Sequence, residues 1–147
     1  LRAGVQGVQV IQPLLLSIPP VPHRGVDSNI AALVLHPNLT AVSATSTQVQ
    51  VTAAPPIGKE QRVVLLLNEA NPPGNRPARA YRFEAPSRDV PDAPVTSATI
   101  TIPISGVAAG EYLVRVQVDG AESPLQAETN PASPTFNQYT APKVTIP

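Results

Sequence analysis

The chain has no cysteine, no methionine and no tryptophan, and aromatic residues make up only 3% of its 147 positions. Without cysteine, neither a disulfide nor a thiolate metal site can form. Three tyrosines and two phenylalanines are too few for the stacking platform that binds single-stranded nucleic acid, and they barely allow an aromatic sugar-binding groove. The scarcity of aromatic rings therefore argues against nucleic acid as a partner.

Charged residues are also scarce, and the two signs balance. They make up 14% of the chain, against about 25% in an average protein, and the formal net charge is zero. No basic field is available to attract nucleic acid or an anionic membrane. The longest apolar run, residues 30–35, is far shorter than the ~18 residues needed to cross a bilayer. We therefore expect neither a nucleic acid nor a membrane as partner.

Side chains that could perform catalysis are few and dispersed. The two histidines, His23 and His36, each stand beside a proline, and no G-x-S-x-G nucleophile motif is present. The ten carboxylates are scattered singly; Asp89 and Asp92 come closest to a pair, without forming a D-x-D ligand run. The glycines do not gather into a phosphate-binding loop. We expect a protein that is not an enzyme and binds no cofactor and no metal.

Proline is abundant, with 19 residues, and it breaks the chain into short segments. Proline removes a backbone donor and stops helices, so a proline-rich but apolar chain favours short strands joined by stiff loops. The best helix candidate is residues 28–35, capped by Asp27 or Ser28 and ended by Pro37 after about two turns. Such a length is marginal for a helix, and a strand remains the alternative for this segment.

Most other segments alternate apolar and polar residues with period 2, which is typical of half-buried strands. Turn signals separate them, with residues 54–58 expected to turn the chain and residues 71–75 and 86–94 expected as loops. The fold class predicted is all-β, an immunoglobulin-like Greek-key β-sandwich of about seven strands over residues 37–147. The expected strands are residues 38–43, 47–53, 62–68, 80–85, 96–104, 111–118, 121–127 and 143–147.

Two short motifs add structural detail to the sandwich. Gly110 stands two residues before Tyr112 at the head of an alternating strand, which is typical of a tyrosine corner. We predict that the Tyr112 hydroxyl bonds to the backbone near Val107 or Ala108; a plain core tyrosine is the alternative. Asp119-Gly120 follows the same strand and predicts a type I′ hairpin turn, in which both residues need positive φ.

Residues 1–36 are predicted to form an N-terminal arm or linker rather than part of the sandwich. Residues 5–11 alternate, residues 14–18 are mostly apolar, and residues 19–22 are expected to form a rigid extended spacer. Because the chain begins with Leu1 rather than methionine, we expect a fragment that lacks an N-terminal domain. Leu14, Leu15 and Leu16 must pack on the sandwich, pack on the missing domain, or form an exposed patch.

A second candidate interaction surface lies around the proline-rich loop at residues 71–77. Arg76, Arg79 and Arg82 follow one another in this loop and the next strand. They are candidates for contact with a partner protein, and a solvated polar face is the alternative. Leu14, Leu15 and Leu16 in the arm and these three arginines are therefore the predicted interaction residues.

Two stretches carry a family resemblance. Residues 12–37, from Gln-Pro-Leu-Leu-Leu-Ser-Ile-Pro-Pro to Leu-Val-Leu-His-Pro, and residues 110–125, together with the closing residues 142–147, resemble the C-terminal immunoglobulin-like region of tail-terminator (cap) proteins. Those proteins belong to phage-tail-like extracellular contractile injection systems. In that family an N-terminal domain forms a ring on the end of the tube and sheath away from the baseplate, and the immunoglobulin-like domain is an accessory.

The resemblance implies a non-catalytic structural role with protein partners. These would be the chain's own N-terminal domain, neighbouring cap subunits or tail components, in a cytoplasmic assembly that can be released as part of an extracellular particle. The alternative is an immunoglobulin-like binding module of a bacterial surface protein or a carbohydrate-active enzyme. An aromatic-lined groove would favour the alternative, and neighbouring sheath, tube and baseplate genes would favour the cap.

Overall fold

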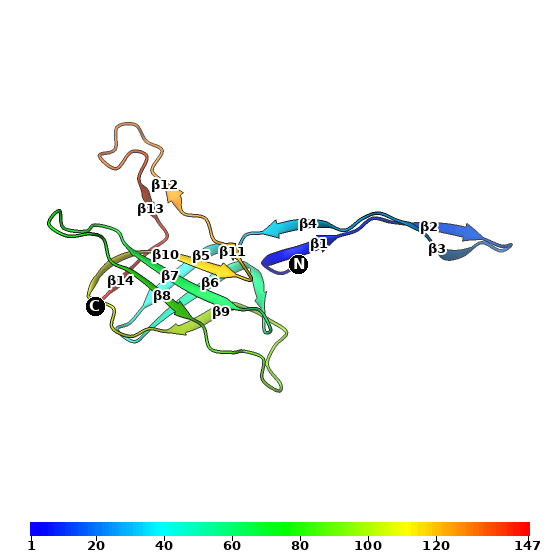
Figure 1. The fold of residues 1–147 in the computed structure, drawn as a ribbon, viewed down its shortest axis with the longest axis horizontal. Helices are drawn as coiled ribbons and strands as arrows, with labels where there is room; N and C mark the ends of the chain where they lie inside the picture. Colours follow the sequence, from blue (N-terminus) through cyan, green and yellow to red (C-terminus); the bar gives the residue numbers. More distant parts are fainter.

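Two facing antiparallel sheets occupy the chain from residue 38 onward in the computed structural model, which describes residues 1–147 (Figure 1). The predicted all-β sandwich is confirmed, and the structure has no helix that could cross a membrane. One sheet has the order β5-β6-β9, with bounds Asn38–Ala44, Gln48–Gly58 and Thr96–Pro103. The other has the order β11-β10-β7-β8, and β14 also pairs with β10. The strands of this second sheet are β7 (Val63–Glu69), β8 (Ala80–Glu84), β10 (Gly110–Val118), β11 (Ala121–Glu122) and β14 (Lys143–Ile146).

The core lies between the two sheets and is built from alternate residues of their central strands. Each of these side chains is almost completely removed from water, which stabilises the fold by about 1.5–3 kcal/mol for a Val, Leu or Ile. Tyr81 and Phe83 of β8 pack against this cluster but remain half-buried. The residues that share the interior include Val49, Val51, Leu65, Leu67, Ile100, Ile102, Tyr112, Val114 and Val116.

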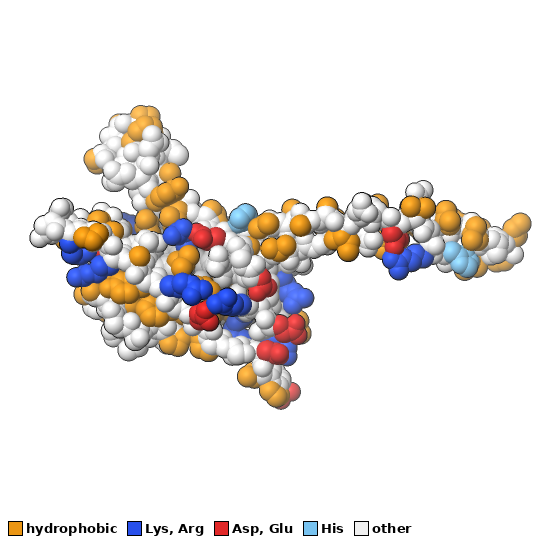
Figure 2. Space-filling view, viewed as in Figure 1, with side chains coloured by type: hydrophobic (Ala, Val, Ile, Leu, Met, Phe, Trp, Pro, Cys, Tyr) orange, Lys and Arg blue, Asp and Glu red, His pale blue; other side chains and the backbone are white.

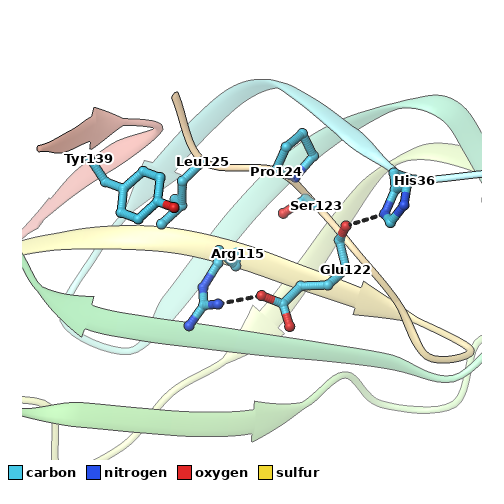
Figure 3. A pocket seen from close by; sticks show the side chains of 7 residues that line it. All are labelled: His36, Arg115, Glu122, Ser123, Pro124, Leu125 and Tyr139. Carbon is cyan, nitrogen blue, oxygen red and sulfur yellow. Dashed lines mark hydrogen bonds and ion pairs between the residues drawn. The ribbon is translucent and has the colours of Figure 1, made fainter. Parts of the chain in front are cut away.

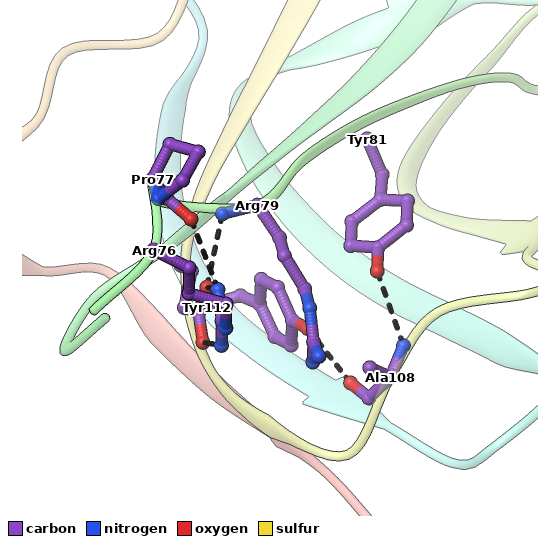
Figure 4. Close-up of polar contacts among 7 residues, drawn as sticks. Arg76, Pro77, Arg79, Tyr81, Ala108 and Tyr112 are labelled. Atoms are coloured by element: carbon purple, nitrogen blue, oxygen red, sulfur yellow. Dashed lines mark hydrogen bonds and ion pairs between the residues drawn. The ribbon is translucent and has the colours of Figure 1, made fainter. Parts of the chain in front are cut away.

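The predicted tyrosine-corner bond is present. The Tyr112 hydroxyl donates to the carbonyl oxygen of Ala108 at 2.7 Å, and the Ala108 amide donates to the Tyr81 hydroxyl at 3.3 Å (Figure 4). The Tyr81 and Tyr112 rings meet edge to face, with centroids 5.8 Å apart. Burial of the Tyr112 phenol raises its pKa, since the phenolate would lose its hydration. The loop before β10 is thus fixed to the core near its end, at Ala108.

The predicted Asp119-Gly120 turn is also present. Val118 pairs with Ala121, which leaves a two-residue loop, and φ is 47° at Asp119 and 89° at Gly120. Positive φ at both loop residues is what a type I′ turn requires, and glycine adopts it without steric cost.

Two expectations about strand ends are wrong. Residues 54–58 do not turn the chain, because β6 continues to Gly58 and its register with β9 shifts between Thr52 and Ile57. A bulge tolerates the missing donors of Pro55 and Pro56, so the strand can pass through them. Residues 121–127 are not a full partner of β10, because that ladder ends at Glu122. Pro124 then carries the chain away into a small projecting hairpin of β12 (Gln126–Ala127) and β13 (Tyr139–Ala141).

The N-terminal segment is a long β-hairpin that projects from one end of the sandwich (Figure 1). The expected extended spacer at residues 19–22 is wrong: the chain reverses at residues 17–20, where Ser17 has φ 76° and its hydroxyl donates to the carbonyl oxygen of Pro19. Residues 28–35, for which the sequence allowed a helix or a strand, contain a strand and no helix. In this hairpin β1 (Gly4–Val8) pairs with β4 (Ala31–Leu35), and β2 (Ile11–Leu16) pairs with β3 (Val21–Asp27).

Candidate functional site: an apolar hairpin arm

The projecting hairpin, residues 4–35, is called the arm below, and its surface is apolar and nearly uncharged (Figure 2). Arg24 and Asp27 are its only charged residues, and they form an ion pair with each other. Thirteen of the eighteen exposed large apolar side chains of the protein lie in the arm. These are Val5, Val8, Val10, Ile11, Leu14, Leu15, Leu16, Ile18, Val21, Val26, Ile30, Leu33 and Val34.

The outer half of the arm, formed by β2 and β3, has two different faces. Directly paired residues share a face, and residues two apart along a strand share it too, so the register assigns every side chain. One face, called the neutral face, carries no charge and consists of Gln12, Leu14, Leu16, Val21, His23 and Val26. The opposite face, called the ion-pair face, consists of Ile11, Pro13, Leu15, Pro22, Arg24 and Asp27.

Gly25 makes this arrangement of faces possible. The register between β2 and β3 shifts beside it, so that Pro13 pairs with Arg24 but Gln12 pairs with Val26. A Cβ atom at Gly25 would lie 2.3 Å from the carbonyl oxygen of Gln12, closer than any side chain is tolerated. Only glycine therefore allows this bulge, and the bulge returns Val26 to the neutral face.

The arm lacks the second layer that stabilises the strands of the sandwich. All six residues of β2 are exposed, and Leu14, Leu15 and Leu16 retain 45%, 68% and 51% of their accessible surface. These leucines do not pack on the sandwich, and within this chain they form an exposed patch. A two-stranded hairpin alone is only marginally stable in water, and a contiguous apolar patch of this kind is typical of a contact surface.

The root of the arm is held to the sandwich on both strands. Ala3 is fully buried, and its carbonyl oxygen accepts a hydrogen bond from Gln61 Nε2 at 2.7 Å. The same nitrogen donates to Asp119 Oδ2 at 2.8 Å, and Gln61 Oε1 accepts from the Gly58 amide at 2.8 Å. On the returning strand, His36 Nδ1 donates to the Glu122 carbonyl oxygen at 2.7 Å. Gln61 is thus the residue that joins the arm to the Asp119 turn.

Sequence reasoning missed this anchor. Gln61 is an isolated polar residue before a strand, and nothing in its local pattern distinguishes it from a solvated side chain. Its partners are 58 residues away along the chain in both directions. Asp119 was predicted only as a turn residue, yet its carboxylate also accepts from the Arg62 amide at 3.0 Å.

An open groove lies beside the arm root, between the end of β10 and the projecting β12–β13 hairpin (Figure 3). Its volume is about 440 Å³, and several of its polar groups are paired within the chain, although the buried Arg115 Nε has no hydrogen-bond partner. Arg115 forms an ion pair with Glu122 and donates to Asn68 Oδ1 at 2.9 Å, while the buried Ser123 hydroxyl accepts from the Val116 amide. Tyr139 is the one aromatic residue in the wall, and it is 61% exposed. The groove is lined by His36, Arg115, Glu122, Ser123, Pro124, Leu125 and Tyr139.

Two of the three arginines predicted to contact a partner, Arg76 and Arg79, lie close to Tyr112 at the end of the loop before β8 (Figure 4). Arg76 binds both carboxylate oxygens of Glu69, at 2.5 and 2.6 Å, and the Arg79 amide donates to Glu69 Oε2 at 2.9 Å. Arg82 lies separately on β8, 3.6 Å from Glu84. The hydrogen bonds from Arg76 and then from the Arg79 backbone lower the pKa of Glu69 to about 2. Arg76 is therefore engaged in holding its own loop.

One known protein family matches most of this chain. Residues 29–145 match a family described as a domain of unknown function (DUF8756). The chain belongs to the DUF8756 family. The DUF8756 match covers the sandwich and begins just before β4, so it includes one strand of the arm. No curated protein and no solved structure matches the chain.

Proposed function

We propose that this DUF8756 chain is a non-catalytic, immunoglobulin-like structural domain that acts by protein–protein contact through its arm. The observation that carries the proposal is the concentration of exposed apolar side chains on an uncharged hairpin that projects away from the core. A partner that covers a strand pair exposed on both faces stabilises it, because each Å² of apolar surface removed from water contributes about 25 cal/mol of favourable free energy. The sandwich then acts as the support that orients the arm.

The strand order supports the immunoglobulin-like part of this proposal. The seven main strands divide into β5-β6-β9 and β8-β7-β10-β14, and the chain crosses repeatedly between the two sheets. The tyrosine at the head of β10 bonds back to Ala108, as in tyrosine corners of such sandwiches.

We further propose that the contacts belong to the cap of a phage-tail-like contractile injection particle. The support is the resemblance of residues 12–37 and 110–125 to the C-terminal region of tail-terminator proteins. The first of these stretches forms most of the arm, from β2 to β4. The partners would be the N-terminal cap domain, neighbouring cap subunits or tail components, assembled in the cytoplasm.

Particle labelling tests the cap assignment. An epitope tag on the β12–β13 hairpin, away from the arm, is introduced into the source organism, and contractile particles are purified and labelled with antibody for electron microscopy. We expect label at one end of the particle, opposite the baseplate, and sheath, tube and baseplate genes beside the gene for this chain. Unlabelled particles, or a gene neighbourhood without tail genes, would contradict the cap assignment.

The groove beside the arm root favours a second candidate, an immunoglobulin-like binding module of a surface protein or carbohydrate-active enzyme. Its wall carries an exposed tyrosine, Tyr139, next to the polar groups of Arg115 and His36. A glycan array would show binding that Tyr139→Ala removes if this candidate holds. An array without binding would leave the arm as the contact element.

A further inference from the structure

We propose that β8 is an interaction edge, to which β8 of a second copy of this chain adds in antiparallel orientation. β8 is the outer strand of the second sheet and pairs with β7 alone (Figure 1). The addition joins the second sheets of the two copies into one continuous sheet around a two-fold axis. This surface lies outside the arm, so the inference depends neither on the arm nor on the cap assignment.

The backbone of β8 leaves hydrogen-bonding groups free at this edge. The Ala85 amide donates to the Val63 carbonyl oxygen, so the odd-numbered residues of β8 direct their backbone groups to β7. The even-numbered residues, Ala80, Arg82 and Glu84, therefore direct amide and carbonyl groups outward, and no hydrogen bond outside the β7–β8 pair involves the backbone of β8. The edge can accept a further strand, because its register with β7 has no shift and β8 contains no proline.

The charges of β8 identify a second copy as its partner. Arg82 and Glu84 are 55% and 53% exposed on the outer face of the sheet, so a complementary antiparallel strand must read basic–apolar–acidic along its own chain. Arg82-Phe83-Glu84 has this pattern itself, and no other three consecutive residues of the chain have it. When two copies of β8 meet in this register, Arg82 of each lies opposite Glu84 of the other. Glu84 is already paired with Arg62 of its own copy, so the added arginine extends an existing ion pair.

The same register places Phe83 on the two-fold axis, directly opposite Phe83 of the other copy. The pair faces the interior, where Phe83 and Tyr81 are half-buried at the edge of the core with ring centroids 6.4 Å apart. The second copy covers the exposed part of these rings, and an aromatic pair across the axis stabilises the contact further. A shift of two residues in either direction places Arg82 opposite Arg82 or Glu84 opposite Glu84, and like charges directly opposite are destabilising.

The contact is small and predicts a weak complex. The five residues of β8 extend over about 16 Å, since strands rise ~3.3 Å per residue. The covered area is therefore below the ~1,200 Å² of stable complexes and belongs with transient ones. We expect a dissociation constant of about 0.1–1 mM for the free chain, and a higher occupancy where other contacts hold the copies together.

Charge reversal on β8 tests the pairing by sedimentation equilibrium of the full chain. Arg82→Glu and Glu84→Arg each place like charges opposite one another, so each variant alone should dimerise at least about fivefold more weakly than the unmodified chain. An equimolar mixture of the two restores opposite charges at both positions and should dimerise as strongly as the unmodified chain. Arg24→Glu makes the same reversal in the arm and should leave the dissociation constant unchanged. A mixture that associates no better than its separate components overturns the pairing.

Cysteine crosslinking traps the weak pair and reads its register, since the chain has no cysteine of its own. Phe83→Cys places two thiols opposite each other on the axis, and with oxidised glutathione at about 0.2 mM protein it should give a disulfide-linked dimer. Tyr81→Cys is the matched control on the same strand and face, because residues 81 of the two copies lie about 13 Å apart. Thermal unfolding checks that both variants are folded. Crosslinking of neither variant, or of both equally, contradicts the pairing.

A variant of the arm separates this contact from the others. Leu14→Lys/Leu16→Lys leaves β8 intact and should dimerise like the unmodified chain. A dimer that this variant abolishes, while the β8 variants keep it, would place the contact in the arm and overturn the pairing of β8. A β8 dimer without particle labelling overturns the cap assignment alone, whereas a chain that labels the particle end but never pairs through β8 overturns the pairing alone.

Discussion

The arm and the sandwich are both built from antiparallel strand pairs, but the same residue type is buried in the sandwich and exposed in the arm. Leu65 in β7 is completely buried, whereas Leu15 in β2 keeps about two thirds of its accessible surface. Most sandwich strands alternate apolar and polar residues, β7 being a continuous apolar run, and a facing sheet covers their inner side. The outer arm strands carry apolar residues on both faces and have no covering layer within the chain. Backbone pairing alone therefore does not decide whether a strand is stable; the second layer does.

The largest effect should come from changing the same residue type in the two regions. Leu65→Ala is expected to lower the free energy of unfolding by about 2–5 kcal/mol, because it leaves a cavity between the sheets. Leu15→Ala should stay within about 0.5 kcal/mol in a dilute monomer, because it removes no buried contact. Urea unfolding followed by far-UV circular dichroism measures both. Equal losses would mean that the arm folds as part of the core.

The tyrosine corner should give the next largest effect. Tyr112→Phe removes the hydroxyl that donates to Ala108 and leaves that part-buried carbonyl without its partner, at a cost of about 1–2 kcal/mol. Tyr139→Phe is the matched control, because this tyrosine is exposed and its hydroxyl makes no hydrogen bond. Thermal unfolding of the two variants provides the comparison. A control that loses as much stability as Tyr112→Phe would refute the structural role of the corner.

The anchor should affect the arm more than the sandwich. Gln61→Ala removes the bonds to Ala3 and Asp119, and we expect faster amide exchange in β1 and β4, with overall stability lowered by about 1 kcal/mol. Exchange in β7 and β10 should stay slow. Gln48→Ala is the control, since its side chain is exposed and bonds to nothing. Hydrogen–deuterium exchange mass spectrometry separates these regions, and uniform acceleration would argue against a local anchor.

The smallest effect concerns pH and is confined to the loop between β7 and β8. The pKa of Glu69 is lowered to about 2 from the ordinary value of 4.5, so its carboxylate stabilises the folded state above that ordinary value. This contribution is lost as pH falls from about 4.5 towards 2, because the unfolded state takes up the proton first. Glu69→Gln should make the free energy of unfolding nearly independent of pH between about 4.5 and 2. Arg76→Gln should narrow the pH range over which stability falls, because it removes the main cause of the lowered Glu69 pKa. An unchanged pH profile in Glu69→Gln would contradict the assignment.

The sandwich was predictable because its signals are local. Alternation marked β10 and its inward Tyr112, and Asp119-Gly120 marked the following turn, since both depend on neighbours in sequence. The continuation of β6 through Pro55 and Pro56 was not predictable, because it depends on a bulge opposite a strand about 40 residues away. The turn at residues 17–20 was hidden because proline-rich runs suit both extended spacers and reversals.

The candidate site was only partly predictable for the same reason. Leu14, Leu15 and Leu16 could be identified as residues in need of cover, since an apolar run outside the body is visible in sequence. The assignment of Leu15 to one face and its two neighbours to the other requires the register with β3 and the bulge at Gly25. The ion pair of Arg76 could not be predicted from the arginine cluster, because its partner, Glu69, comes from the preceding strand; the predicted contact of Arg76, Arg79 and Arg82 with a partner stays a prediction.

The way both strands of the arm are fastened gives it a mechanical property. Ala3 is tied through Gln61 to the turn after β10, and His36 is tied to Glu122 immediately beyond that turn. The returning strand also continues through His36 and Pro37 into β5, an edge strand of the first sheet. A pull on the tip of the arm would therefore be divided between this covalent connection to the first sheet and the side-chain attachments to the second, so that both sheets carry the load.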